Sequence, residues 1–151
     1  MPRVKKIYDE PKKKSNNTAQ IIILYEYLLR NKDMFFDKFF EIILNDKIKI
    51  FVIDFFITVY SNKKNIIIET SKDNYIDVYN DYKTQLKSYN KKYFDPYKRF
   101  KKIELEHKNQ KIITTIGQMN FFKWLITNNI IEYIEKNYDY IYREFKVFNK
   151  K

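Results

Sequence analysis

The chain has 151 residues, of which 44% are hydrophobic and 19% aromatic, so it can bury one sizeable core and form a single domain. It contains no cysteine, which excludes disulfides, thiolate metal sites and cysteine nucleophiles. Its formal net charge is +11, and its one glycine excludes the glycine-rich loops that cradle phosphates.

The positive charge is concentrated in two parts of the chain. Residues 1–16 carry six basic and two acidic groups, and we expect a flexible basic arm there because the lysine run has no apolar face. Residues 17–80 have a net charge of −1, whereas residues 81–111 carry ten basic and four acidic groups, a net charge of +6. An AT-rich genome also produces lysine-rich proteins, but codon drift alone would spread the lysines more evenly. The distribution therefore favours a basic patch.

Helical periodicity dominates the region after the arm. Asn17 or Thr18 can cap a first helix, in which apolar residues recur at helical spacing. Second and third helices are predicted at about 33–44 and 49–60. The third contains the most apolar window of the chain, IKIFVIDFFITVY, which is too short and too charged to span a bilayer.

Two short hairpins and one helix are predicted in the middle of the chain. IIIET at 66–70 predicts a strand, and YIDVY at 75–79 predicts either its partner strand or the entry to the next helix. That helix is predicted at about 79–91. The second hairpin is predicted in RFKKIELEHKNQKIITT, residues 99–115, with KNQ as its turn.

Two helices complete the predicted fold. Thr115 and Gln118 have the three-residue offset of a capping box, so a helix is predicted to begin there. Gly117 is expected to allow a close approach between helices or to ease the first helical turn. The last helix is predicted at 130–145. Together these elements predict one globular α+β domain at 17–151, predominantly helical, with one or two small β-hairpins.

The stretch YNKKYFDPYKRFKK, residues 89–102, interleaves aromatic rings with basic groups. Lysine and arginine hold a phosphate backbone by displacing its counterions, and exposed rings can stack on unpaired bases. Lys83, Lys87 and Lys91 lie one helical turn apart in the predicted helix and would extend the basic face. The predicted nucleic-acid-binding residues are Lys83, Lys87, Lys91, Lys92, Lys98, Arg99, Lys101 and Lys102. In either case we expect most of the rings to be buried.

Two other interpretations compete with this one. A helix-turn-helix at 115–137 would present acidic residues to the phosphates, and its aromatic residues are expected to pack in the core. The triplet Glu106-His107-Lys108 contains the carboxylate and lysine of metal-dependent nucleases, and Asp95 would supply a second carboxylate. Charged residues are common at a hairpin tip, however, and a lone histidine such as His107 is expected to be solvated there. We therefore expect no catalytic residue, no metal site and no cofactor.

Three segments within residues 47–138 resemble, in their order, a family of short basic proteins from giant nucleocytoplasmic large DNA viruses of the mimivirus-like kind. The segments are IKIFVIDFFITVYSNKKN, DYKTQLKSYNKKYFDPYKR and TTIGQMNFFKWLITNNIIEYIEKN. The positions that match the family's motifs are Tyr82, Lys83, Gln85, Leu86, Lys87, Tyr89, Lys91, Lys92, Phe94, Asp95 and Pro96, then Thr115, Gly117, Gln118, Asn120, Phe121, Phe122 and Trp124. The resemblance implies a viral protein made in an infected cell, and it implies no particular activity.

The sequence therefore predicts a small, basic, non-enzymatic viral protein that binds the backbone of DNA or RNA through its Lys/Arg-rich face. The alternative is a protein-interaction or virion structural module without a nucleic-acid role, in which aromatic residues anchor a viral protein partner. Because the N-terminal residues are polar throughout, we expect no secretory signal and no membrane segment. The expected location is the host cell cytoplasm or nucleus, with packaging in the virion as a further option.

Overall fold

The computed structural model describes the backbone of residues 12–150 and the side chains of residues 18–150. Residues 1–11, most of the predicted arm, lie outside this described part. The elements in chain order are α2 (Lys12–Asn45), α3 (Ile50–Phe55), η1 (Phe56–Tyr60), α4 (Ser61–Lys63), β1 (Ile67–Ser71), β2 (Asn74–Asp77), α5 (Val78–Ser88), η2 (Lys91–Tyr93), β3 (Lys102–His107), β4 (Gln110–Thr115), α6 (Ile116–Thr127), α7 (Ile130–Lys136) and α8 (Tyr138–Asn149).

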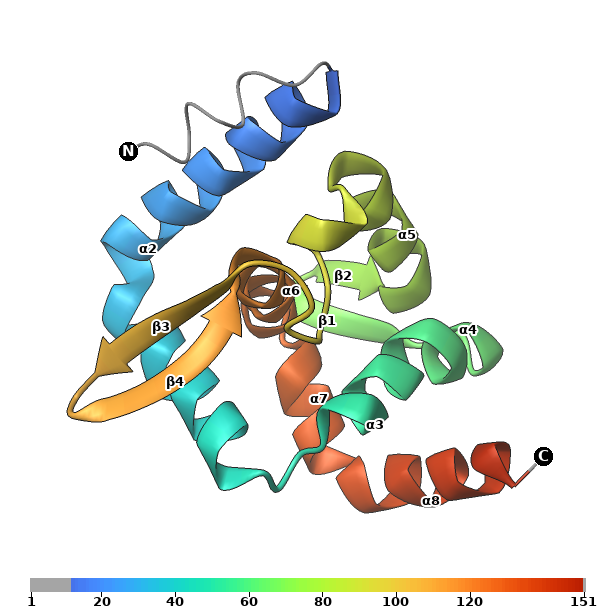
Figure 1. Cartoon of the computed structure of the whole chain (residues 1–151). Helices are drawn as coiled ribbons and strands as arrows, with labels where there is room; N and C mark the ends of the chain where they lie inside the picture. Colours follow the sequence, from blue (N-terminus) through green and yellow to red (C-terminus); the bar gives the residue numbers. More distant parts are fainter. Residues whose placement is uncertain (1–11, 151) are drawn as a thin grey trace.

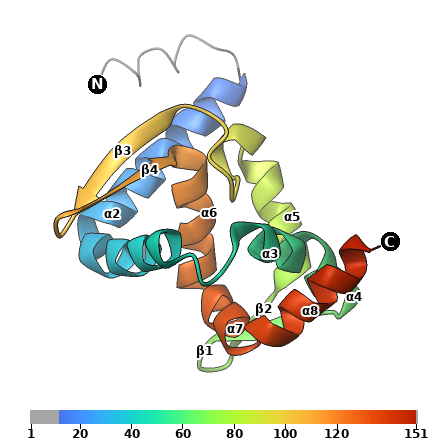
Figure 2. The same ribbon diagram turned by 60° about the horizontal axis from the view of Figure 1, so that its bottom comes forward.

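The other elements surround one central helix. Figure 1 shows α6 in the middle, with α2 along one side of it and α5 on the other. The β3–β4 hairpin lies against α2, while α7 and α8 continue from α6 toward the opposite end of the molecule (Figure 2). Each of the two sheets is one antiparallel pair of strands, so the predicted α+β fold, predominantly helical, is confirmed.

The central helix is buried along most of its length because apolar residues occur on every side of it. Its buried residues are Gly117, Gln118, Met119, Asn120, Phe121, Phe122, Trp124 and Leu125. A helix of this kind is stable only where neighbours cover all its faces. α2 provides part of the cover, with the Phe39 ring 5.1 Å from that of Phe122. The expected core role of this aromatic segment is confirmed, and α6 has no free face for a DNA groove.

α2 joins the first two predicted helices into one bent element. Asn31 has non-helical backbone angles (φ −127°, ψ 19°), and its side-chain amide donates a hydrogen bond to the carbonyl of Tyr27 at 3.0 Å. The bend lies between the two predicted segments. α2 begins at Lys12, so the backbone of residues 12–16, the described end of the predicted arm, is helical.

The third predicted helix extends slightly farther than expected, through α3, η1 and α4 to Lys63. Its η1 part is a π-helical turn, a wider turn that inserts one extra residue per hydrogen bond. The Ser61 hydroxyl donates to the carbonyl of Ile57 at 2.8 Å within this segment. Asn65, with φ 53°, then turns the chain into β1.

The segment YIDVY supplies both structures proposed for it, because β2 leads directly into α5. Asp77 ends β2 and caps α5, accepting a hydrogen bond from the backbone N–H of Asn80 at 3.2 Å. α5 ends at Ser88, and Tyr89 is extended (φ −105°, ψ 145°). The predicted row of three lysines on one helix is therefore wrong: Lys91 lies in η2, beyond the end of α5.

The second hairpin has a tighter turn than predicted. Leu105 pairs with Ile112 and His107 with Gln110, which leaves only Lys108 and Asn109 in the turn. Both turn residues have positive φ, 49° and 67°, as a two-residue type I′ turn requires. The predicted three-residue KNQ turn is corrected to Lys-Asn.

The last predicted helix is two helices, α7 and α8. Asn137 separates them with non-helical angles (φ −116°, ψ 18°), and its side chain donates to the carbonyl of Tyr133 at 2.9 Å. The buried residues Ile130, Ile134 and Ile141 face the core as predicted. Among residues 12–150, no helix has the length and apolar character that a membrane crossing requires.

Candidate nucleic-acid interface

All eight predicted cations are exposed to solvent. They lie on α5, on η2, in the loop that joins η2 to β3, and at the start of β3, and they are Lys83, Lys87, Lys91, Lys92, Lys98, Arg99, Lys101 and Lys102. We call the segment 89–102, which carries six of them, the basic loop. Lysines on the solvent-facing side of any packed segment are also exposed, so exposure alone does not indicate a binding site. The geometry of the loop must therefore be considered as well.

The basic loop lies directly against the first turn of α6. A Cβ atom on Gly117 would lie 2.5 Å from the carbonyl oxygen of Lys92, so only glycine permits this approach. The backbone N–H of Asp95 donates to the carbonyl of Gly117 at 3.2 Å. The expected close approach at Gly117 is present, and its partner is the short 3-10 helix η2 within the basic loop.

Gln118 fixes the next part of the loop. Its side-chain amide donates to the carbonyl of Pro96 at 2.8 Å, and its Oε1 accepts from the Thr114 hydroxyl at 2.7 Å. Thr115 caps α6 as predicted, accepting from the N–H of Gln118 at 3.0 Å. The reciprocal half of the predicted capping box is replaced, because the Gln118 side chain binds the loop instead.

Two further residues of α6 hold neighbouring segments. The Asn120 side-chain amide donates to the carbonyl of Tyr93 at 3.0 Å, which ties η2 to α6. The Trp124 indole N–H donates to a carboxylate oxygen of Asp81 at 2.6 Å, which ties α5 to α6. The two motifs in YNKKYFDP and TTIGQMNFFKW thus form one unit: buried polar groups of α6 set the position of the basic loop.

Asp95 organises the second half of the loop from a buried position. Its carboxylate accepts hydrogen bonds from Nε and Nη2 of Arg99 at 2.9 and 3.0 Å, and from the N–H of Tyr97 at 3.2 Å. The hydrogen bond to Asp95 raises the pKa of Arg99 above its ordinary value. Arg99 stays charged, but the Asp95 carboxylate balances that charge, so Arg99 is the least available of the eight cations.

Other cations of the loop converge on an aromatic ring. Lys92 Nζ lies 4.8 Å and Lys101 Nζ 5.9 Å from the centroid of the Phe100 ring, so both ammonium groups contact the same ring. Arg99 lies 4.7 Å from the Tyr97 ring. The expectation that most rings of this stretch are buried is wrong, since only Phe94 is buried and Tyr89, Tyr93, Tyr97 and Phe100 are half-buried.

Asp54 places a second carboxylate beneath the loop. It accepts a hydrogen bond from the Tyr97 hydroxyl at 3.4 Å. Burial raises the pKa of Asp54, and the Tyr97 hydrogen bond and the charges of Lys91 and Arg99 act in the opposite direction. The Asp54 carboxylate thus offsets part of the positive potential of the basic loop.

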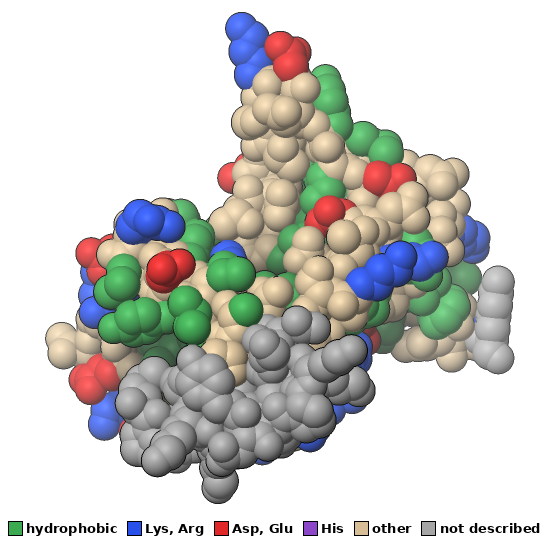
Figure 3. All heavy atoms as spheres, turned by 90° about the horizontal axis from the view of Figure 1, so that it is seen from above, with side chains coloured by type: hydrophobic (Ala, Val, Ile, Leu, Met, Phe, Trp, Pro, Cys, Tyr) green, Lys and Arg blue, Asp and Glu red, His purple; other side chains and the backbone are tan. Residues whose placement is uncertain are grey.

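Figure 3 shows the molecule from above the view of Figure 1. On this face the Lys and Arg side chains stand apart from one another, with carboxylates and apolar groups between them. Outside the part that the grey residues cover, this face therefore shows separate cations and not one continuous basic surface.

His107 is not solvated, contrary to the expectation for a lone histidine beside a turn. It is only 7% exposed and packs against the rings of Phe36 and Phe40, each 5.5 Å away. Its Nε2 is 2.8 Å from Asp37 on α2, and Lys108 Nζ is 3.0 Å from the same carboxylate. The expectation of a solvated histidine fails because the hairpin tip packs against α2, which is distant in sequence.

The nuclease interpretation finds no support in this geometry. His107 and Lys108 both engage Asp37, and Asp95 is bound to Arg99. In the described range 12–150, no three His, Asp or Glu side chains are grouped as metal ligands would be. His107 and Lys108 of the triplet thus anchor the hairpin tip to α2.

The anchor predicts a pH-dependent effect of Asp37→Asn. Hydrogen bonds from His107, and then from Lys108, lower the pKa of Asp37. A lowered folded-state pKa contributes stability above the unfolded-state value near 4, and this contribution is lost as the pH falls through the folded-state value. We expect Asp37→Asn to lower the Tm at pH 7 and to have no effect at about pH 2, measured by circular dichroism. A Tm loss of equal size at both pH values would contradict the ionic anchor.

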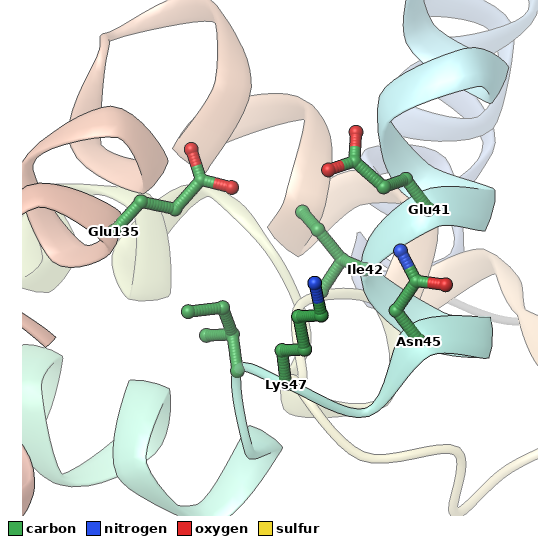
Figure 4. Close-up of a pocket in the computed structure, with 6 residues that line it drawn as sticks. Glu41, Ile42, Asn45, Lys47 and Glu135 are labelled. Atoms are coloured by element: carbon green, nitrogen blue, oxygen red, sulfur yellow. The ribbon is translucent and has the colours of Figure 1, made fainter.

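A half-open hollow of about 190 Å³ lies between the end of α2 and α7. Figure 4 shows Glu41 reaching toward it from α2, Glu135 from α7 and Lys47 from the connecting loop. Lys38 Nζ lies 2.7 Å from Glu135 and 3.9 Å from Glu41, so a lysine already balances both acids. These contacts link α2 to α7 and indicate a structural role.

The comparisons with known proteins give a family. Residues 5–151 match the model of a family of unknown function, DUF7197. The chain is also 38% identical over 113 residues to "Uncharacterized protein L507" of Acanthamoeba polyphaga mimivirus, an alignment that covers 69% of this chain and 44% of the relative. The chain thus spans less than half the length of this relative. No solved structure matches this chain. The expected link to an uncharacterised giant-virus family is confirmed, and the chain belongs to the family of unknown function DUF7197.

Proposed function

We propose that the protein is a non-enzymatic nucleic-acid-binding protein that holds the phosphate backbone with the cations of α5 and the basic loop. The observation that carries the proposal is the rigid presentation of the loop: Gly117, Gln118 and Asn120 fix its backbone, while its lysines remain exposed. Polar groups buried in a core are costly unless they are bonded. Their use here to position a strongly basic, solvent-facing loop supports a role for that loop beyond packing.

The charge balance supports the same proposal. Residues 81–111 have a net charge of +6, and only Arg99 among the eight cations forms an ion pair within the described residues. Lys92 and Lys101 both contact the Phe100 ring. Ammonium groups without an ion-pair partner can neutralise phosphates and so release the counterions that are condensed on a nucleic acid.

The test is a charge reversal of four loop lysines, Lys91, Lys92, Lys98 and Lys101, each to Glu. Arg99 is left intact because its bond to Asp95 is structural. At 0.1 M salt we expect the affinity for DNA or RNA to fall at least about tenfold and the salt dependence to flatten, since each lost phosphate contact reduces the slope by about 0.9. Fluorescence anisotropy with a labelled oligonucleotide over a salt series measures both.

A matched control reverses the same number of charges elsewhere. Lys64, Lys72, Lys136 and Lys150 are exposed and form no ion pair within the described residues. Figure 2 places the β1–β2 turn and α7 at the end of the molecule opposite the basic loop. The control variant should retain most of the affinity. Equal losses in both variants would show that total charge matters and that the loop is not the site.

The rival function, a protein-interaction or virion structural module, is favoured by one observation. Ile22, Tyr25 and Leu29 follow one another along a face of α2 and are 44%, 58% and 67% exposed. Exposed apolar side chains in a row are typical of protein contacts. Weak retention on a heparin or DNA column together with a self-associated mass by light scattering would favour this rival. Strong salt-sensitive retention as a monomer would favour nucleic-acid binding.

A further inference from the structure

We infer that the ligand of the basic loop is a duplex, held by its phosphates without base stacking. This inference rests on the proposed function and specifies its substrate class. It depends on which surfaces of the aromatic rings remain free. Proteins that bind single strands combine basic grooves with exposed rings on which successive bases stack. The question is therefore whether the rings near these cations can accept a base.

The rings of the basic loop are already engaged. Phe100 is contacted by the ammonium groups of Lys92 and Lys101, and its ring centroid is 5.8 Å from that of Tyr93. The Tyr97 ring is covered by the Arg99 guanidinium, which Asp95 holds in place.

The remaining rings near the cations are engaged in the same way. Tyr89 stacks on the buried Phe94 with ring centroids 5.0 Å apart and planes at 25°. On α5, Lys83 Nζ lies 5.6 Å from the Tyr79 ring centroid. None of the aromatic residues of α5 or of the basic loop belongs to the strongly exposed apolar residues of the described chain. A base would have to displace a cation or a neighbouring ring in order to stack there.

The exposed rings lie on other elements. Tyr75 on β2 is 66% exposed, Tyr25 on α2 is 58% exposed, and Phe148 on α8 is 47% exposed. Stacking surfaces and the loop cations thus belong to different parts of the chain. A site that offers cations without free rings gains affinity from charge alone.

Charge density then selects the duplex. Double-stranded DNA carries one charge per about 1.7 Å of its axis, and each neutralised phosphate contributes a salt slope of about 0.9 on a duplex and about 0.7 on a single strand. For four contacts, and equal affinity at 1 M salt, this difference gives roughly sixfold tighter binding of the duplex at 0.1 M salt. A single strand can overcome that deficit only through stacking, which the covered rings do not offer.

The experiment compares a labelled 20-base-pair DNA duplex, the corresponding RNA duplex, and each separated strand with the full chain over a salt series. We expect both duplexes to bind several-fold more tightly than their strands at 0.1 M salt, with the steeper salt slope. Two ring variants test the reason: Phe100→Leu, in the basic loop, and Tyr75→Leu, at an exposed ring outside it. Neither should change the ratio of duplex to single-strand affinity by more than about twofold.

The outcomes separate the two proposals. Tighter binding of the single strands, or a selective loss of single-strand affinity in either ring variant, would overturn the duplex inference and leave nucleic-acid binding intact. Binding of neither form at low salt would overturn the proposed function and the inference with it. If Phe100→Leu lowers the duplex affinity and the single-strand affinity by the same factor, the inference is supported. A parallel loss shows that the ring orients the lysines and does not contact bases.

Discussion

Phe39→Ala is expected to lower the free energy of unfolding by about 3–5 kcal/mol, because it removes a fully buried ring at the centre of the core. The Phe39 ring lies 5.2 Å from that of Phe35 on the same helix and 5.1 Å from that of Phe122 on α6. It therefore joins α2 to the central helix, and the cavity left by alanine cannot be filled from either side without a backbone shift. Urea unfolding followed by circular dichroism measures the loss.

Tyr25→Ala is the matched control for this substitution. Tyr25 lies on the same helix, is aromatic and is 58% exposed. Its replacement should change the free energy of unfolding by no more than about 0.5 kcal/mol, since surface positions contribute little. Equal losses at both positions would mean that α2 is stabilised as an isolated helix and not by its contact with α6.

The sequence predicted the existence and type of most elements because their apolar residues recur at the spacing of helices and strands. The ends of the helices were less predictable. Asn137 breaks the last predicted helix, and its side chain bonds the carbonyl of Tyr133, a choice that the periodicity of the apolar residues does not reveal. The bend at Asn31, in contrast, falls between two segments that were predicted as separate helices. The number of separate helices therefore differs from the prediction, although the buried faces agree with it.

Long-range contacts explain the larger errors around the candidate site. α5 stops at Ser88 because Tyr89 extends toward Phe94, whose loop is bound to α6, so Lys91 leaves the predicted lysine row. His107 is buried because the hairpin tip reaches Asp37, 70 residues away. Neither partner is close in sequence, and local patterns carry no information about such pairs.

The site itself was predictable in composition but not in geometry. The eight cations could be identified from charge clustering, and all are exposed. The pairing of Arg99 with Asp95 at an offset of four residues was open to prediction, since both are charged and lie in one short loop. The hydrogen bond from Gln118 to the basic loop was not predictable, because a capping box accounts equally well for a glutamine at this position.

Gly117→Ala is expected to destabilise the protein by about 1–3 kcal/mol, although alanine is the better helix former by about 1 kcal/mol. The new Cβ would lie 2.5 Å from the carbonyl oxygen of Lys92, and backbone cannot rotate away as a flexible side chain can. The basic loop must shift outward, which strains the bonds from Asp95 to Gly117 and from Gln118 to Pro96. Urea unfolding measures the loss of stability.

The same substitution links the core of the protein to its proposed interface. If the loop carries the nucleic-acid site, Gly117→Ala should weaken binding at temperatures where the variant is still folded, because Lys92 moves relative to Lys101. Thr127→Ala, at the exposed end of the same helix, should change neither stability nor affinity appreciably. A Gly117→Ala variant with raised stability would show that the helix propensity of alanine outweighs the contact, and that the loop does not need the space that glycine provides. A destabilised variant with unchanged affinity would place the nucleic-acid site away from the basic loop.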